Sequence, residues 1–342
     1  MMQATVRIIT DLRTMSFYNV AKDMKRVIEE ESEHKVEINH IESCITDSPK
    51  NIILIGTLHP GFLNYGMRYE KIRNTLCYFT VEGVNETSFS LKPNVTYIAN
   101  SKFSKECAEK MGINVSDVIW HGVDLNDYSR DEEWEESIKN KLINKTILFT
   151  NANNDPRKGL DKLLIAFKMV ERVFLGDDFL ILHTHENGYY SLRELAKLLE
   201  IENLWITNLM GGLTTKQMNS LYHLSHIYVN SSMAEGFCLP LIEALKWGLP
   251  IVTPAIPTAI ELLGESNSAL LFPTRDIIEI PYYLRSGIKF LIHNYKINDL
   301  ADTLIKLLLN TKLINSMKEA TKEEVKKFDC RKLYKKFIEY LK

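Results

Sequence analysis

Short apolar segments recur along the whole chain, and most neighbouring pairs leave room for a helix between them. There are eleven, each six or seven residues long, and they are apolar along most of their length rather than at alternate residues. Such runs are typical of strands buried on both faces of a parallel sheet. Amphipathic stretches between them, such as residues 160–174, predict helices. The pattern therefore predicts the α/β class. The segments begin at residues 5, 51, 76, 95, 117, 145, 179, 203, 226, 249 and 269.

The 342 residues are enough for about two domains. An acidic, proline-free stretch at 124–145 separates the first five apolar segments from the other six, and nothing in it resembles a core strand. We therefore place a linker there, with a first domain at 1–135 and a second at 136–320. The lysine-rich residues 321–342 predict a terminal helix, because an apolar residue recurs at every fourth position from 333 to 341. We expect this helix to pack back toward the first domain.

Composition excludes several classes of protein. Lys and Arg number 42 and Asp and Glu 44, so the chain lacks the overall positive field of a nucleic-acid-binding protein. The five cysteines include no C-x-x-C pair, which argues against a disulfide framework and a zinc site. Arg7 and Asp11 lie where a signal peptide would need apolar residues, and no apolar run approaches the roughly 20 residues of a membrane span. We expect a cytoplasmic protein, with peripheral contact at the inner membrane surface left open.

Residues 235–250, EGFCLPLIEALKWGLP, predict a ligand-binding loop followed by a short helix. Pro240 suits the first helical position and Gly248 the end of the helix, which we place at 240–247. Gly236 would let the backbone approach a ligand closely. An anion could accept hydrogen bonds from the backbone amides, aided by the positive end of the helix dipole. The amides are those of Gly236, Phe237, Cys238 and Leu239.

Two glutamates, Glu235 and Glu243, flank this helix start, and both carboxylates can face one crevice. An ionised carboxylate only accepts hydrogen bonds, so its natural partners beside a bound nucleotide are sugar hydroxyls. One would bind the ribose and the other a transferred sugar. The spacing alone carries little weight, because an exposed Glu235 and a Glu243 favoured by the helix dipole would give the same sequence.

The segment EGFCLPLIEALKWGLPIV closely resembles the signature of the retaining glycosyltransferases of family 4, which have the GT-B fold. In that signature E-G-F-x-L-P is followed by E-A and G-x-P, and Glu235 and Glu243 match the E-x7-E motif. The resemblance implies two Rossmann-like, doubly wound domains facing a central cleft, the first binding the acceptor and the second a nucleotide-sugar. It also implies that Glu243 binds the ribose and Glu235 contacts the donor sugar. Met210 is included among the donor-binding residues.

Residues 154–159, NDPRKG, match the phosphate-binding lysine loop of that family, which implies that Lys158 binds the donor diphosphate. The local sequence is consistent with this role, because Lys158 directly precedes a predicted helix whose positive end would face the same anion. The family usually has Gly-Arg where this chain has Asn151 and Ala152. Arg157 could supply the missing charge, although both Arg157 and Lys158 could also be exposed loop residues.

Glu82, in the segment FTVEG, stands where many members of that family carry a histidine. A glutamate there could accept a hydrogen bond from a sugar hydroxyl or take the acceptor proton, or it could simply cap a neighbouring amide. The chain has no D-x-D sequence. We therefore expect no metal and no cofactor, and assign stabilisation of the leaving group to Lys158 and the amides of the 236–239 loop.

Together with the resemblance, which alone implies retention, these observations predict a retaining, metal-independent glycosyltransferase with Glu235, Lys158 and Glu82 as catalytic residues. Its acceptor could be a glycan, a lipid-linked sugar, a protein or a small molecule, and the oligomeric state is left open. Two alternatives remain: a degenerate protein that binds a nucleotide-sugar without transferring it, and a related GT-B sugar-nucleotide epimerase. A measurement of turnover would distinguish the degenerate binding protein, which has none, from an active transferase. The E-G-F-x-L-P sequence argues against the second.

Overall fold

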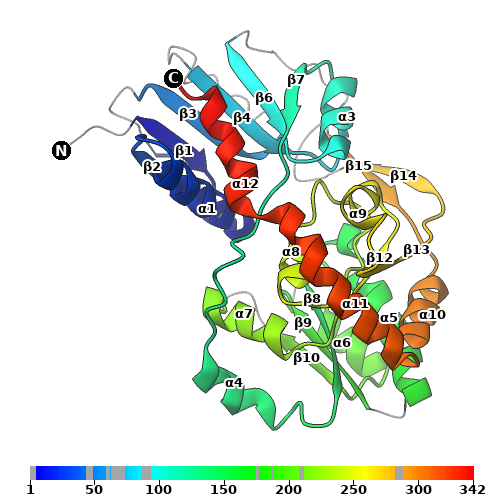
Figure 1. Cartoon of the computed structure of the whole chain (residues 1–342). Helices are drawn as coiled ribbons and strands as arrows, with labels where there is room; N and C mark the ends of the chain where they lie inside the picture. Colours follow the sequence, from blue (N-terminus) through cyan, green and yellow to red (C-terminus); the bar gives the residue numbers. More distant parts are fainter. Residues whose placement is uncertain are drawn as a thin grey trace.

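A computed structural model of the chain describes residues 5–43, 49–58, 62, 74–85, 94–174, 177–186, 188–207, 212–281 and 288–342. Met210, one of the predicted donor-binding residues, lies outside these ranges. Two large sheets form separate halves of the molecule, and helices cover both faces of each (Figure 1).

The first half contains a parallel sheet of six strands. They are β1 (Val6–Thr10), β2 (Val36–His40), β3 (Asn51–Thr57), β4 (Asn74–Thr80), β6 (Val95–Ala99) and β7 (Val115–Val118). Their order is β2-β1-β3-β4-β6-β7, so the apolar segments β3 and β4 lie in the centre, where both faces are buried. Helices α1 (Met15–Glu31) and α12 (Cys330–Tyr334) cover one face, and α3 (Lys102–Lys110) covers the other.

The second half contains another parallel sheet of six strands. They are β8 (Thr146–Asn151), β9 (Asp178–His183), β10 (Leu204–Thr207), β11 (Ile227–Val229), β12 (Ile251–Pro254) and β13 (Ala269–Phe272). The order β10-β9-β8-β11-β12-β13 again places the first strand inside the sheet. One face carries α5 (Leu160–Phe174), α6 (Leu192–Leu198), α10 (Ile297–Leu308) and α11 (Thr311–Glu324). The other carries α4 (Glu132–Lys139), α7 (Thr215–Leu224), α8 (Leu239–Lys246) and α9 (Pro257–Leu263).

Each of the eleven predicted segments overlaps a strand of these two sheets, which confirms the predicted fold class. The fifth was misplaced, since β7 begins two residues before the predicted 117–122 and ends at Val118. Strand β2 was not predicted, because it is an edge strand with only its first residue buried and so lacks an apolar run. Helix α8 begins at Leu239, one residue earlier than predicted.

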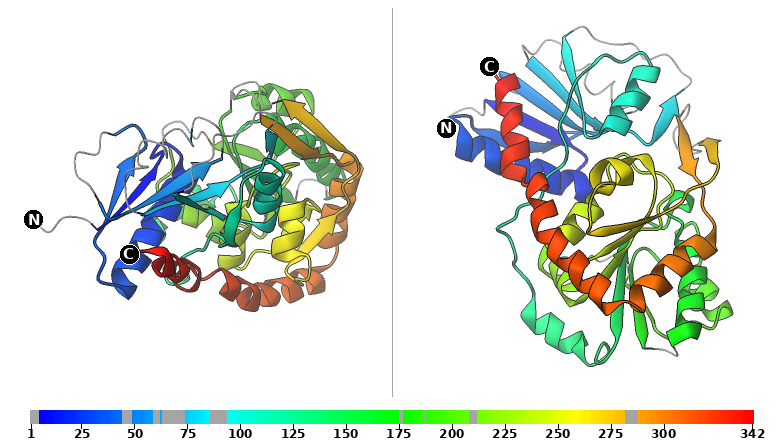
Figure 2. Two further views of the ribbon diagram at one scale, coloured as in Figure 1. Left: turned by 90° about the horizontal axis from the view of Figure 1, so that it is seen from above. Right: turned by 45° about the vertical axis from the view of Figure 1, so that its right-hand side comes forward.

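A third, three-stranded antiparallel sheet joins the two halves. It consists of β14 (Ile277–Pro281) and β15 (Ile288–His293) from the second half and β5 (Gly83–Asn85) from the first. Gly83 pairs with Phe290, and a Cβ atom at Gly83 would lie 1.8 Å from the carbonyl oxygen of Lys289. Only glycine therefore allows β5 and β15 to approach this closely. The sheet bridges the halves at the side opposite α1 (Figure 2).

The end of the chain crosses back over both halves (Figure 2). The predicted single helix is broken: after α11 come a 3-10 turn at Val325–Phe328, α12, and a second 3-10 segment at Lys335–Tyr340. Leu333, Tyr334 and Phe337 are buried in the core of the first sheet. The returning segment meets the outgoing one at Gly122, where a Cβ would lie 2.4 Å from the Cα of Cys330. The chain segment that leaves the first half, at Gly122, and the segment that returns to it, at Cys330, are therefore in direct contact.

Candidate active site

A cleft of about 580 Å³ lies where the carboxyl ends of the two large sheets face each other. Thr57 and Thr80, the last residues of β3 and β4, line it from the first half. Asn151 and His183, the last residues of β8 and β9, line it from the second. Parallel α/β sheets collect ligands at this edge, because loops there lead into helix N-termini. The cleft contains most of the residues that the sequence predicted for a site.

Lys158 enters the cleft from a tight turn between β8 and α5. The Asp155 side chain accepts a hydrogen bond from the Arg157 amide (3.1 Å) and so caps a 3-10 turn at Pro156–Lys158. Gly159 then adopts φ 60°, and α5 begins at the next residue. The lysine therefore directly precedes a helix N-terminus, as the sequence predicted.

Four side chains form a charge cluster in the cleft: Glu82, Arg157, Lys158 and Glu235. The Lys158 Nζ lies 2.5 Å from Glu235 Oε1, and the Arg157 guanidinium lies 3.2 Å from Glu82 Oε2 and 3.6 Å from Glu235 Oε2. Their side chains are only 8 to 16% exposed. Arg157 also donates to the carbonyl oxygen of Ala234 (2.9 Å). Asp155 lies 3.8 Å from the Arg157 Nε as well, so three carboxylates face two cations here, and Arg157 and Lys158 are not exposed loop residues.

The two carboxylates of the charge cluster have pKa values shifted in opposite directions. Burial acts to raise the pKa of Glu235, but the charges of Lys158 and Arg157 and the hydrogen bond from Lys158 outweigh it and lower the pKa. Burial raises the pKa of Glu82, and the opposing charges of Arg157 and Lys158 do not fully compensate for it. Glu82 is therefore the carboxylate more easily protonated, and Glu235 stays ionised.

The backbone amides at the start of α8 have no hydrogen-bond partner among the described residues, and three of the four residues that carry them line the cleft. Among the described residues, none accepts a hydrogen bond from the backbone amides of 236–239. Cys238 adopts φ 69°, a left-handed conformation that is rare for a residue other than glycine and marks a constrained loop. Phe237, Cys238 and Leu239 line the cleft. This arrangement fits the predicted anion-binding loop.

Gly236 has a role that the sequence did not predict. A Cβ atom there would lie 2.0 Å from the Thr80 Oγ1 and 3.0 Å from the carbonyl oxygen of Val81, both in the first half. Its carbonyl oxygen accepts hydrogen bonds from the Ser101 hydroxyl (2.5 Å) and the Ser104 hydroxyl (3.2 Å). The missing side chain lets the two halves pack against each other, and Gly236 itself does not line the cleft.

Glu243 is linked through the Tyr222 hydroxyl to Asn151 at the cleft. It is half-buried on α8, its Oε2 accepts a hydrogen bond from the Tyr222 hydroxyl (2.7 Å), and it is not among the described residues that line the cleft. Asn151, which does line the cleft, accepts from the Tyr228 hydroxyl (2.8 Å) and lies 3.2 Å from the Tyr222 hydroxyl. Burial raises the pKa of Glu243, against the hydrogen bond from Tyr222. The shared crevice for Glu243 and Glu235 therefore stays a prediction, since Glu243 is linked to the cleft only through Tyr222 and Asn151 among the described residues.

The sequence profile described as "Glycosyl transferases group 1" matches residues 131–324, more than half of the chain. The chain belongs to this family. The match covers α4 to α11 and therefore the second large sheet, Arg157, Lys158 and the loop of Glu235. The protein is accordingly a group 1 glycosyltransferase.

Similarity to individual proteins extends beyond the region of the profile. "Uncharacterized glycosyltransferase 335" of Sulfolobus islandicus rod-shaped virus 1 is 25% identical over 97% of this chain and 99% of its own length. A glycosyltransferase from Rickettsia africae (14% identity, TM-score 0.74) covers 99% of this chain and 98% of its own. HepE from Anabaena, solved with UDP and glucose (15% identity, TM-score 0.68), covers 98% of this chain and 99% of its own. These structures share the fold along almost the full length, which confirms the GT-B architecture.

Further residues of this group 1 glycosyltransferase line the cleft from the first half without having been predicted as site residues. His121 is buried, with Nδ1 2.8 Å from the Tyr78 hydroxyl and Nε2 3.1 Å from Asn100 Nδ2. Burial lowers the pKa of His121 to about 3, so its ring is neutral near pH 7. No short motif marks this pair, because His121 and Asn100 follow different strands and meet only in the folded sheet.

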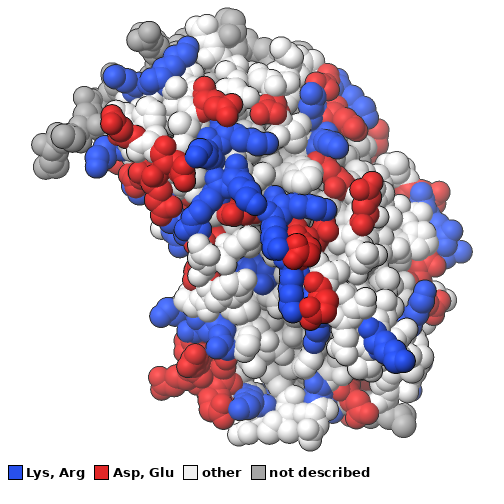
Figure 3. Space-filling model, viewed as in Figure 1, with Lys and Arg blue, Asp and Glu red and all other residues white. Residues whose placement is uncertain are grey.

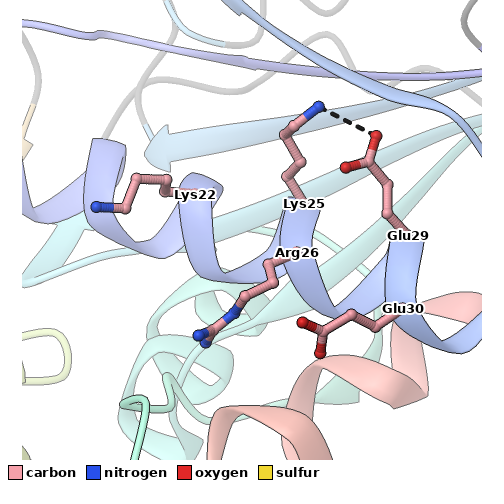
Figure 4. Close-up of a pocket in the computed structure, with 5 residues that line it drawn as sticks. All are labelled: Lys22, Lys25, Arg26, Glu29 and Glu30. Atoms are coloured by element: carbon pink, nitrogen blue, oxygen red, sulfur yellow. Dashed lines mark hydrogen bonds and ion pairs between the residues drawn. The ribbon is translucent and has the colours of Figure 1, made fainter. Parts of the chain in front are cut away.

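A second hollow lies on the outer surface of α1, away from the cleft (Figure 4). Lys22, Lys25, Arg26, Glu29 and Glu30 line it, and Lys25 contacts Glu29 (3.1 Å). Figure 3 shows that basic side chains on this face have acidic ones beside them. The hollow is therefore a surface of partly paired charges and presents no concentrated field for a ligand.

The group 1 glycosyltransferase shows no cluster of three or more His, Cys, Asp or Glu side chains suited to a metal ion within the part of the chain that the structure describes. In that same part, no helix has the length and apolar character needed to cross a membrane. Metal independence stays a prediction.

Proposed function

We propose that this group 1 glycosyltransferase moves a sugar from a nucleotide-sugar to an acceptor hydroxyl with retention of anomeric configuration. The observation that carries the proposal is that Lys158, Arg157 and residues 237–239 line the same cleft, and that the amides of 237–239 have no partner among the described residues. The two cations and these amides are suited to a diphosphate, whose negative charge grows as the sugar bond breaks. HepE, which has the same fold, was solved with UDP and glucose and with UDP-glucose.

The charge cluster suggests how these residues divide the work. A bound diphosphate would compete with Glu235 for Lys158 and with Glu82 for Arg157, since each cation already faces a carboxylate. Glu235, released from Lys158, would accept hydrogen bonds from hydroxyls of the donor sugar. The leaving phosphate would help to deprotonate the acceptor on the same face of the sugar, which gives retention.

A nucleotide-sugar-binding protein without transferase activity is the second candidate. It is favoured by the ion pair between Glu82 and Arg157, which occupies a cation that the diphosphate would need. Product analysis separates the two. Incubation with a panel of nucleotide-sugars and acceptors should yield product whose anomeric proton coupling matches the donor. A donor at 100 times its Kd that stabilises the fold by about 2.7 kcal/mol but gives no product in any combination would favour the binding protein.

The Glu243→Ala variant is expected to weaken donor binding by about 1.5–3 kcal/mol, because the ribose hydroxyls would lose a charged acceptor. The measurement is donor and nucleoside diphosphate affinity by calorimetry. Tyr222→Phe is the matched control, because it removes the hydroxyl that donates to Glu243 but keeps the carboxylate. If Glu243 only anchors Tyr222, both variants lower the melting temperature and neither changes affinity, which would remove Glu243 from the site.

The Glu82→Gln variant keeps the shape of the side chain but removes its charge. If the carboxylate takes the acceptor proton, kcat should fall at least tenfold, about 1.4 kcal/mol of barrier, with donor affinity similar. Because burial raises the pKa of Glu82, wild-type activity should rise with pH as the group ionises, and the Gln variant should lack that rise. Wild-type turnover with an unchanged pH profile would assign Glu82 a structural role.

A further inference from the structure

Strand β15 contacts Glu82 and Arg157 of the charge cluster and the loop that leads to Glu235, although it contributes no charged side chain to the cluster. The Leu291 amide donates to the carbonyl oxygen of Glu82 (3.3 Å), and the His293 amide donates to the carbonyl oxygen of Met233 (2.8 Å). The Met233 amide in turn donates to the carbonyl oxygen of Arg157 (2.7 Å). One strand therefore fixes the backbone that carries Glu82 and the loop that leads to Glu235.

Phe290, also on β15, covers the guanidinium of Arg157. The Cζ of Arg157 lies 5.4 Å from the centre of the Phe290 ring, within the range of a cation–π contact. Phe290 is half-buried and lines the cleft. Because the ring covers a face of the guanidinium, the donors at its edge are left for Glu82, Glu235 and the carbonyl oxygen of Ala234.

We propose that Phe290 is a positioning residue for transfer: it fixes the plane of the Arg157 guanidinium so that the edge donors point at the leaving diphosphate. The proposal rests on the function proposed above. Glu82, Glu235 and Asp155 lie 3.2, 3.6 and 3.8 Å from the edge of this guanidinium while Phe290 covers its face, so without the ring the guanidinium plane could tilt about these contacts. Gly83 allows Phe290 to reach Arg157, because β15 can pair this closely with β5 only where β5 has a residue without a side chain.

The kinetic test compares Phe290→Leu, which keeps apolar volume, with Phe290→Tyr, which keeps the ring. Phe290→Leu is expected to lower kcat roughly 3- to 30-fold with KM changed less than about twofold, and Phe290→Tyr to stay near wild type. In an Arg157→Gln background, Phe290→Leu should cause no further loss. Equal losses in both backgrounds, or a loss in Phe290→Tyr as large as in Phe290→Leu, would overturn the proposal. The control is Ile277→Ala, on β14 of the same sheet and 61% exposed.

A spectroscopic test separates this proposal from the proposed function. In arginine-labelled protein, with the Arg157 signal assigned from an Arg157→Lys sample, the ring should shift the side-chain resonances of Arg157. Phe290→Leu should remove that shift, and Ile277→Ala should leave it. An unchanged Arg157 signal in Phe290→Leu overturns the positioning role even if sugar transfer is observed. Absence of transfer in wild type, with the shift present, defeats only the proposed function.

Discussion

Replacing Lys158 with alanine is expected to lower kcat by about 100-fold or more, which is the usual effect of removing one group that stabilises charge in a transition state. Lys158 should matter more as the sugar bond breaks than in the bound donor, so turnover should fall by a larger factor than donor affinity. Lys162→Ala is the matched control, because Lys162 lies on α5 and contacts Asn294 and Tyr295 outside the cleft. Near-normal turnover of Lys158→Ala would exclude it from the phosphate site.

Folding must be monitored in the same experiment, because Lys158→Ala removes the nearer cation from Glu235 and leaves it with Arg157 at 3.6 Å and a hydrogen bond from Ser232. Loss of the Lys158 ammonium as a partner of Glu235 should lower the free energy of unfolding by about 1–3 kcal/mol. It should also raise the pKa of Glu235, so the stability that its ionised form contributes would be lost at a higher pH as the solution is acidified. Adding Glu235→Gln should restore the melting temperature without restoring turnover.

EDTA is expected to leave wild-type sugar transfer unchanged. If EDTA abolished transfer and a divalent ion restored it, the proposal of a metal-free reaction would be refuted.

Gly236→Ala is expected to reduce kcat/KM by roughly 100-fold, because even small misplacements of reacting groups have effects of this size. The new methyl group would meet Thr80 Oγ1 at 2.0 Å and the carbonyl oxygen of Val81 at 3.0 Å, so the α8 loop and the end of β4 must separate. Stability should fall by about 1–3 kcal/mol. Steady-state kinetics and thermal unfolding measure the two effects.

Thr80 provides the control for this substitution. The double variant Thr80→Ala/Gly236→Ala removes the shorter contact, and part of the lost stability should return, while the contact with Val81 prevents full recovery. Gly264→Ala tests whether any tightly packed glycine would behave alike, since it is not among the described residues that line the cleft and the three atoms nearest to its new Cβ all belong to Ile260 of α9. If Gly236→Ala retained both wild-type stability and kcat/KM, the close approach of the halves at this point would be irrelevant to activity.

The features of the fold that could be predicted from the sequence are those encoded in a short continuous segment. Apolar runs such as those of β3 and β4 mark buried parallel strands, and the turn at 154–159 followed by α5 places Lys158 at a helix N-terminus. The third sheet could not be predicted in this way. The residues of β14 are all exposed, β5 has only three residues, and β5 pairs with β15, which lies about 200 residues further along the chain.

In the candidate site, too, the residues within one continuous segment could be predicted and the contacts between distant segments could not. Glu235 and the α8 loop belong to one continuous segment, so a sequence signal exists for them. The ion pair between Arg157 and Glu82 and the contact of Phe290 with Arg157 depend on how the halves meet, which no local pattern encodes. For Glu243 the sequence placed the residue on α8 but gave no sign of its hydrogen bond with Tyr222, which comes from another helix.

The return of the chain end to the first sheet determines when that sheet can be completed during synthesis. Tyr334 and Phe337 fill the core beside Tyr78, yet they emerge from the ribosome about 200 residues after β7. At ordinary translation speeds this delay is on the order of 10 to 40 seconds. Throughout it, the apolar surface that α12 will cover stays open to chaperones and to neighbouring nascent chains, so the half of the protein that is made first finishes folding last.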